Sequence, residues 1–285
     1  MGENSLALFC DAHFHLVPSF DALGEQASCA FRAVTAAHSQ EEFFRQEEFV
    51  NKLNGAANQN DGKSKNAALS LACDQSCAPR LLQSFGLHPQ EPLLQNLDFL
   101  EGLLREGRVQ AVGECGYDFF TKEFSDKAAA QEKAFAAQVE LAARYKVSAI
   151  VHARKAMDKI FASAVALKKV PVVVFHSFAG TPADARSLLD KGINAYFSFG
   201  KPLMNGAKKA IACVRSLPIE RLLFETDAPY QTLKGELATS PAEIADVYQA
   251  AFEIRAAGVP FEARPSFADF AAAIESNFNS AFGLR

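Results

Sequence analysis

The chain has 285 residues, of which 49% are hydrophobic, enough for a large core in one α/β domain or in two small ones; we expect a single domain over residues 1–285. The formal net charge of −4 provides no global basic field, which argues weakly against nucleic-acid binding, although metal ions would offset the charge of a carboxylate-rich site. No apolar run approaches the roughly 18 residues that a membrane span needs, and we expect no signal peptide, so the six cysteines should be reduced thiols in a soluble, cytoplasmic protein.

The first third of the chain begins with an apolar run from Leu6 that ends in His13 and His15, which we expect to be a strand. A second strand is predicted at 29–34, ending near His38, and Ser39 with Glu42 has the form of a capping box, which predicts a helix over 40–53. The polar, glycine-bearing segment 54–66 is expected to be a surface insertion, followed by a short helix at 67–73 and a third strand at 80–87.

From residue 93 onward, predicted helices and strands alternate regularly. The apolar spacing predicts helices over 93–106, 127–145, 156–167, 181–190 and 203–216, and strands over 109–114, 147–152, 170–176, 193–199 and 221–227. Thr181 and Pro182 are expected to cap and begin the fourth of these helices. Two helices, 241–256 and 266–282, complete the chain.

This order of elements predicts the fold class α/β and the architecture of a parallel (β/α)8 TIM barrel, with an open doubly wound sheet as the alternative. The polar residues favour the barrel. An open sheet would spread the strand ends across tens of ångströms, whereas a barrel gathers all of them at one mouth.

Several predicted strands stop on residue types that bind metal ions. His13 and His15 are two apart on one strand, so both side chains can reach the same ion. A lone histidine in such a place is usually a hydrogen-bonded interior residue, but the coincidence over five strands indicates a metal centre. The candidate ligands are His13, His15, Glu114, His152, His176 and Asp227.

Two further histidines are not among the candidate metal ligands. His88 begins a His-Pro turn, which leaves a contact to ligand or substrate and simple turn chemistry equally open. His38 precedes a helix cap and is expected to be structural. Glu225 shares a face with Asp227 but lies deeper, so it should be a structural carboxylate with a partner of its own.

The same segments together resemble the TatD family of metal-dependent deoxyribonucleases over about residues 9–230. The helix around Gln131 and Gln138 is also similar to a helix of that family. The segments that carry the resemblance are Asp11-Ala-His13-Phe-His15, Gly86-Leu-His88-Pro89, Val112-Gly-Glu114-Cys-Gly116-Tyr-Asp118, His152-Ala-Arg154, His176-Ser-Phe178 and Glu225-Thr-Asp227-Ala-Pro229-Tyr230.

The resemblance implies an amidohydrolase-type TIM barrel with one or two divalent ions that hydrolyses phosphodiester bonds, commonly of DNA, with a metal-activated water. It implies that His13, His15 and Asp227 hold one ion, that His152 and His176 hold the other, and that Glu114 bridges them, with Asp227 also acting as general base. Mixed imidazole and carboxylate ligands suit Zn or Mn better than Mg, and the metal is left open among the three.

The chain departs from the family on the substrate side. The usual Arg-Asn-Glu-Pro segment is replaced at 237–243, where the Arg and Asn are missing, and Tyr117 stands where Leu is usual. We expect Arg154, His88 and Tyr117 to contact substrate, with the Arg154 fork on phosphate, although a structural salt bridge is as good an explanation for Arg154.

The altered entrance leaves three functions open. The first is a nuclease acting on DNA or another phosphodiester. The second is a related hydrolase of a small phosphoester, amide or lactone, and the third is a non-catalytic barrel used for protein interaction. We infer no membrane association and no obligate protein partner.

Overall fold

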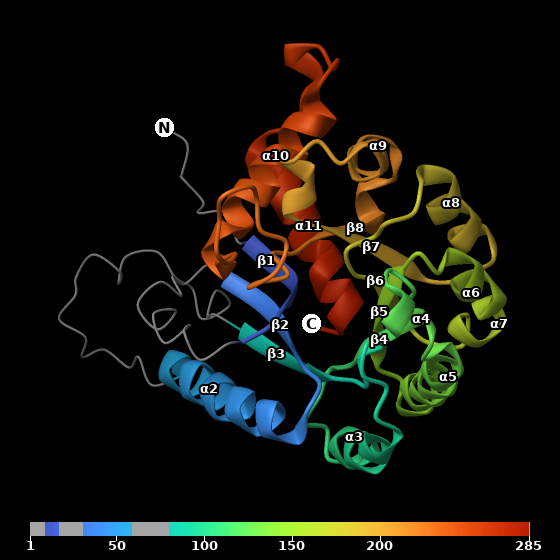
Figure 1. Ribbon diagram of the computed structural model, residues 1–285. Helices are drawn as coiled ribbons and strands as arrows, with labels where there is room; N and C mark the ends of the chain where they lie inside the picture. Colours follow the sequence, from blue (N-terminus) through green and yellow to red (C-terminus); the bar gives the residue numbers. More distant parts are fainter. Residues whose placement is uncertain (1–8, 17–30, 59–79, 285) are drawn as a thin grey trace.

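A computed structural model describes residues 9–16, 31–58 and 80–284, and its eight strands form one parallel sheet in sequence order (Figure 1). This arrangement confirms the predicted (β/α)8 architecture. The strands are β1 (Phe9–Phe14), β2 (Phe31–Ala37), β3 (Arg80–Phe85), β4 (Ala111–Asp118), β5 (Ser148–Arg154), β6 (Val173–Phe175), β7 (Ala195–Phe199) and β8 (Leu222–Phe224).

Backbone hydrogen bonds close the sheet into a barrel between β1 and the segment after β8. The Asp227 N–H donates to the His13 carbonyl at 3.0 Å, and the His15 N–H donates to the Ala228 carbonyl at 2.7 Å. The buried Asp11 carboxylate accepts hydrogen bonds from the backbone and hydroxyl of Thr226 across the same seam. An open doubly wound sheet is therefore excluded.

Most helices surround the barrel on its outside, whereas α11 (Phe267–Phe282) crosses its centre in this view and contributes Phe278 to the inner core (Figure 1). The other main helices are α2 (Gln40–Asn58), α3 (Leu97–Arg105), α5 (Ala128–Tyr145), α6 (Met157–Ala162), α7 (Ala164–Leu167), α8 (Pro182–Asp190), α9 (Lys208–Ser216) and α10 (Ile244–Ala256). Short helical turns form α4 (Lys122–Ser125), η3 (Leu94–Asn96), η4 (Lys201–Leu203), η5 (Ile219–Arg221), η6 (Pro241–Glu243) and η7 (Phe261–Ala263). Among the described residues, no helix has both the length and the apolar character needed to cross a membrane.

Local sequence explains several helix boundaries. Thr181 caps α8 in a capping box with Asp184, with Pro182 at the first position, as predicted. The helix expected at 156–167 is instead divided at Ser163 into α6 and α7. Residues 54–58 of the expected insertion are helical, because α2 continues to Asn58, whereas 59–66, the helix expected at 67–73 and the first two residues of the strand expected at 29–34 lie outside the described residues.

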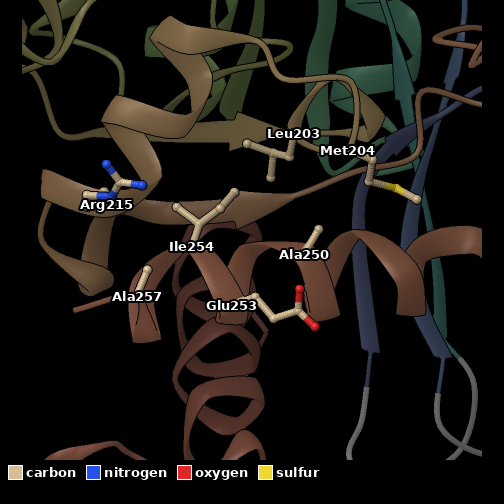
Figure 2. Close-up of a pocket in the computed structure, with 7 residues that line it drawn as sticks. All are labelled: Leu203, Met204, Arg215, Ala250, Glu253, Ile254 and Ala257. Carbon is tan, nitrogen blue, oxygen red and sulfur yellow. The ribbon is translucent and has the colours of Figure 1, made fainter. Parts of the chain in front are cut away.

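The hydrophobic core has an inner and an outer part. The inner part takes residues from all eight strands, including Val34, Ile150 and Leu223, and is joined by Phe278 and Phe282 of α11. The outer part lies between the strands and the surrounding helices. Helices α9 and α10 with η4 also border a shallow surface hollow (Figure 2), which none of the predicted site residues lines.

Candidate metal centre

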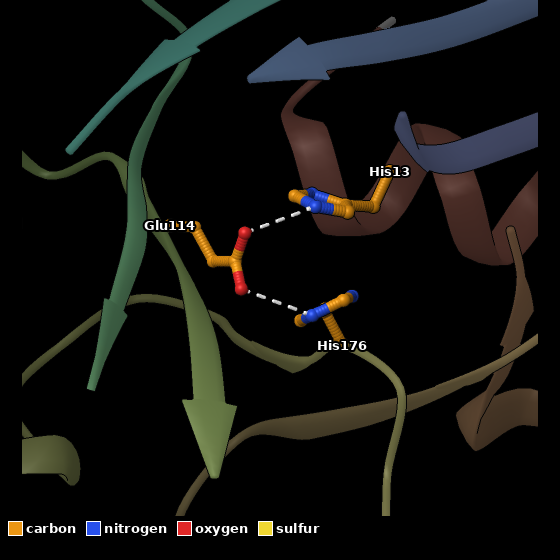
Figure 3. Close-up of side chains that lie close together, drawn as sticks. All are labelled: His13, Glu114 and His176. Atoms are coloured by element: carbon orange, nitrogen blue, oxygen red, sulfur yellow. Dashed lines mark ion pairs between the residues drawn. The ribbon is translucent and has the colours of Figure 1, made fainter. Parts of the chain in front are cut away.

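The six predicted ligands lie together at the carboxyl ends of the strands, with Glu114 of β4 in the middle. Glu114 Oε2 is 3.3 Å from His13 Nε2 and 3.7 Å from His15 Nε2. Its other oxygen, Oε1, is 3.1 Å from His176 Nε2 and 2.5 Å from His152 Nδ1. Figure 3 shows His13 beside one Glu114 oxygen and His176 beside the other, so the two oxygens of one carboxylate contact different imidazoles.

Asp227 belongs to the group around Glu114 Oε2. Its Oδ1 lies 3.6 Å from His15 Nε2 and 3.7 Å from His13 Nε2. The residue follows β8 in a left-handed conformation (φ 52°), which turns the chain toward β1. Gln231 donates to the other Asp227 oxygen at 3.0 Å and holds the carboxylate in this orientation.

The ligand atoms lie in two neighbouring lobes, both in contact with Glu114: the first contains His13, His15 and Asp227, and the second contains His152 and His176. The ligand atoms of His13, His15 and Asp227 lie within 4.8 Å of one another, as do those of His13, Glu114 and His176. His152 forms a further group of this kind with Glu114 and His88. Such a set of imidazole nitrogens and carboxylate oxygens can bind divalent metal ions.

Buried carboxylates orient two of these imidazoles by contacting the ring nitrogen that does not face the centre of the site. His176 Nδ1 is 3.1 Å from Glu225 Oε1, which also accepts a hydrogen bond from the Ser177 backbone, so Glu225 has the partner that was predicted for it. His152 Nε2 is 3.2 Å from Asp118 Oδ2. Second partners of this kind fix which ring nitrogen faces a metal and raise its basicity.

The packing of β4 against β5 requires a glycine beside the centre. Gly116 has φ +138°, and a Cβ added there would collide with the His152 carbonyl oxygen. Because Gly116 has no side chain, β4 and β5 approach closely enough for Glu114 and Asp118 to reach the two nitrogens of His152.

The protonation of the centre suits cation binding. Burial raises the pKa of the Glu114 carboxyl, but the surrounding imidazoles outweigh burial and hold that pKa well below its usual range. Asp227 behaves in the same way, its pKa being lowered by the hydrogen bond with His15. Burial and the neighbouring His176 lower the pKa of His13, which leaves a neutral imidazole with a lone pair to donate.

Other histidines gain protons in this environment. Although burial lowers the pKa of His176, the carboxylates of Glu114 and Glu225 raise it well above its usual range. The pKa of His15 and of His152 is raised in the same way by carboxylate neighbours. A bound cation would take the place of these protons, since metal and proton compete for the same nitrogens.

His38 was predicted to be structural, and the structure places it beside the centre. It lies just beyond β2 with its Nε2 3.7 Å from Glu114 Oε2 and its ring 5.3 Å from that of His15. Burial and the neighbouring His88 lower its pKa well below the usual range, and its Nε2 has no hydrogen-bond partner among the described residues. A neutral, inward-facing imidazole nitrogen of this kind is a fourth candidate ligand for the first lobe.

The position of His88 is compatible with both of the alternatives left open for it. Its Nδ1 accepts a hydrogen bond from the Gln90 backbone in the turn, and its Nε2 lies 3.3 Å from Glu114 Oε1. Arg154 ends β5 with its guanidinium carbon 3.6 Å from the centre of the exposed Phe120 ring, and no salt bridge to it is found in the described part of the chain.

Tyr117 does not reach the centre, contrary to the prediction of a substrate contact. Its side chain is buried between β4 and α5, where its ring packs 5.0 Å from that of Phe135. Tyr117 lies three residues after Glu114 in β4, so it faces outward with Cys115 while Glu114 faces the mouth. The prediction missed Asp118, whose signal was its place four residues after Glu114, at the end of the same strand.

An eight-stranded parallel barrel with a histidine and carboxylate centre at its mouth defines a class, that of TIM barrels able to bind metal ions between their strand ends. Within this class, residues 10–283 match the family described as TatD related DNase. The chain belongs to the TatD family.

Several relatives and solved structures are similar to the chain. The 3'-5' ssDNA/RNA exonuclease TatD of Klebsiella pneumoniae is 35% identical over 161 residues, which are 55% of this chain and 60% of that protein. A protein named as an uncharacterized metal-dependent hydrolase of Mycoplasma pneumoniae is 32% identical over 53% of this chain and 62% of its own length. The chain therefore matches about three fifths of these relatives.

The structural likeness extends over the whole chain. The crystal structure of a TatD homologue from Escherichia coli is 26% identical with a TM-score of 0.70, over 97% of this chain and 98% of that one. A TatD family hydrolase from Entamoeba histolytica superposes with a TM-score of 0.72 at 18% identity, over 98% and 99% of the two chains, which supports the fold alone.

Proposed function

We propose that this protein is a divalent-metal-dependent hydrolase of the TatD type that cleaves phosphodiester bonds of nucleic acid. The observation that carries the proposal is the Glu114 carboxylate, whose two oxygens face two separate groups of imidazoles. A shared carboxylate between two nitrogen-rich lobes is the arrangement that a pair of ions requires. The name of the Klebsiella pneumoniae relative, a single-stranded DNA and RNA exonuclease, supports the substrate class.

The residues present fit one or two divalent ions. His13, His15 and Asp227, with His38 beside them, would hold one ion, and His152 and His176 the other, with Glu114 between them. When bound, such ions lower the pKa of a coordinated water and neutralise charge on phosphoryl oxygens. The nitrogen content favours Zn or Mn over Mg.

Side chains of the protein supply proton transfer and orientation. Asp227 is ionised, and it lies at the mouth with one oxygen toward His13 and His15, so it would accept the proton of the attacking water. Glu225 and Asp118 keep the rings of His176 and His152 turned toward Glu114. Arg154 at the rim would bind a phosphate oxygen through its planar fork.

Exposed aromatic rings at the rim support a nucleic-acid substrate. Tyr230 is 59% exposed and packs its ring 5.2 Å from His15, and Phe120 is 46% exposed next to Arg154. Exposed rings beside a phosphate-binding cation are typical of proteins that hold single strands, because every base can stack on an aromatic face.

The test is hydrolysis by protein stripped of metal and then reloaded with Zn, Mn or Mg in turn. We expect cleavage of a labelled single-stranded oligonucleotide by at least one metal form, and none by the stripped protein or by the His13→Ala, His15→Ala variant in any metal. A panel of small phosphoesters, amides and lactones serves as the comparison. Turnover of a panel member with no cleavage of the oligonucleotide would replace the nuclease with a small-molecule hydrolase.

A further inference from the structure

Two neighbouring cations lie against one aromatic ring at the rim of the barrel. The Arg154 guanidinium carbon is 3.6 Å from the centre of the Phe120 ring, and Lys155 Nζ is 4.6 Å from the same centre. Lys155 Nζ also donates to the Phe120 carbonyl at 3.4 Å. Cations are attracted to the face of an aromatic ring, so Phe120 holds both side chains in place.

The backbone at Lys155 is bent to produce this arrangement. Consecutive residues of a strand point to opposite faces, so Arg154 and Lys155 would diverge if β5 simply continued. Lys155 instead has φ 55°, in the left-handed region that side chains other than glycine seldom adopt. The turn brings two positive charges to one place, and a strained residue beside a reactive centre is a sign of function.

Neither cation is neutralised within the described part of the chain. Both residues are exposed, and neither forms an ion pair with a described carboxylate. The adjacent Asp118 is not available for this, because its two oxygens are bonded to Gln90, His152 and the Phe120 backbone. The two charges are therefore free to meet an anion from solution.

The pair is fixed in position relative to the metal centre. The Phe120 N–H donates to Asp118 Oδ1 at 2.8 Å, and the other Asp118 oxygen is 3.2 Å from His152 Nε2. The Phe119 N–H donates to the Arg154 carbonyl at 2.8 Å, which ties the same turn to β5. A short chain of hydrogen bonds thus connects the ring under the cations to the second lobe of the centre.

We propose that Arg154, Lys155 and Phe120 form a phosphate clamp that holds a nucleic-acid strand beside the bond to be cut, with Lys155 binding a phosphate additional to that on Arg154. The inference rests on the proposed nuclease function and adds a second point of attachment to it. The fork of Arg154 matches phosphate oxygens, while Lys155 acts as a point charge. Such contacts position the strand without reading its sequence.

The experiment measures binding of a fluorescent oligothymidylate by anisotropy, in chelator so that nothing is cleaved, over a series of salt concentrations. The variants are Lys155→Gln, Lys155→Arg and Phe120→Leu. The matched control is Lys169→Gln, which removes an exposed lysine before β6, at the opposite end of the barrel. Circular dichroism and thermal melting check that each variant is folded.

Each phosphate contact on a single strand contributes about 0.7 to the slope of log affinity against log salt. We expect Lys155→Gln to make the slope less steep by about that amount and Phe120→Leu to make it less steep as well. Lys155→Arg and Lys169→Gln should keep the wild-type slope. Equal slopes for Lys155→Gln and wild type would overturn the clamp while leaving the nuclease proposal in place. If the metal-free wild type itself failed to bind the oligonucleotide, the clamp would be rejected, and cleavage by the metal-loaded protein would decide the nuclease proposal separately.

Discussion

At the scale of single residues, Asp227 is where the chemistry of the centre can be tested most directly. Asp227→Asn keeps the shape and one ligand oxygen but removes the basicity, so we expect turnover to fall by roughly 10² to 10⁴ while some metal stays bound. Single-turnover cleavage at saturating metal, with metal content measured on the same sample, checks this. Cleavage near the wild-type rate would show that another group takes the proton, and Glu114 would be examined next.

Cys213 makes a second prediction at this scale. Its side chain is fully buried, and burial raises the pKa of the thiol to about 12. Because the thiolate is the reactive species, we expect no alkylation of Cys213 by iodoacetamide at pH 8 in the folded protein and complete alkylation in urea. Peptide mass spectrometry measures the fraction of Cys213 that is alkylated in the folded and the urea-treated samples. Rapid modification in the folded state would mean that α9 opens readily.

The residues also show what sequence can and cannot reveal about a site. The metal-ligand types at strand ends were recognisable because histidine and glutamate are costly to bury without a purpose. The side on which Tyr117 lies was missed because the strand was expected to end at Glu114, whereas β4 continues to Asp118 and its alternation turns Tyr117 toward the helices. The position of His38 beside the centre could not be predicted from its own segment, because it depends on the neighbouring strands β1 and β4.

At the scale of elements, the loop after β8 is held by a buried lysine. Lys201 follows β7, is fully buried, and donates to Glu236 and, at 3.0 Å, to Glu243. The same Glu236 oxygen accepts from the Leu233 N–H at 2.7 Å. These bonds fix the loop that carries Tyr230 and Gln231.

Removing this lysine should loosen the loop and destabilise the protein. For Lys201→Met we expect a loss of about 1 to 3 kcal/mol in the free energy of unfolding, below the value for a fully buried pair because both carboxylates are partly exposed. Urea denaturation followed by circular dichroism measures it. Lys208→Met, which removes an exposed lysine of α9, is the control and should stay within about 0.5 kcal/mol of wild type. Equal stability of the two variants would show that the buried bonds contribute nothing.

Elements were predicted well where a cap and apolar spacing agreed, as in α8, and less well where tertiary contacts set the ends. β6 and β8 are shorter than their apolar runs, because the chain leaves the sheet to place His176 and Asp227. β4 is longer than expected, so Glu114 lies within the strand and Asp118 at its end. Such differences depend on the neighbouring strands, which a local pattern does not contain.

At the scale of the whole molecule, metal should stabilise the fold, because the ligands come from strands far apart in the chain. Metal at 100 times its dissociation constant should add about 2.7 kcal/mol to the free energy of unfolding. Thermal melting with added Zn or Mn, and again after chelation, should show a reversible rise in Tm. The His13→Ala, His15→Ala variant should melt cooperatively with no metal-dependent shift; an unchanged shift would place the metal elsewhere.

The closure of the barrel has a consequence for the order of synthesis. β1 is made first, but the Tyr248 hydroxyl of α10 bonds to both backbone groups of Cys10, across 238 residues, and α11 packs against β1 and β8. A nascent chain on the ribosome can therefore pair β1 with β2 early, yet it cannot complete the contacts of β1 until α10 and α11 emerge. Until then the edges of β1 and β8 are open, and a chaperone that shields them would act on this half-made barrel.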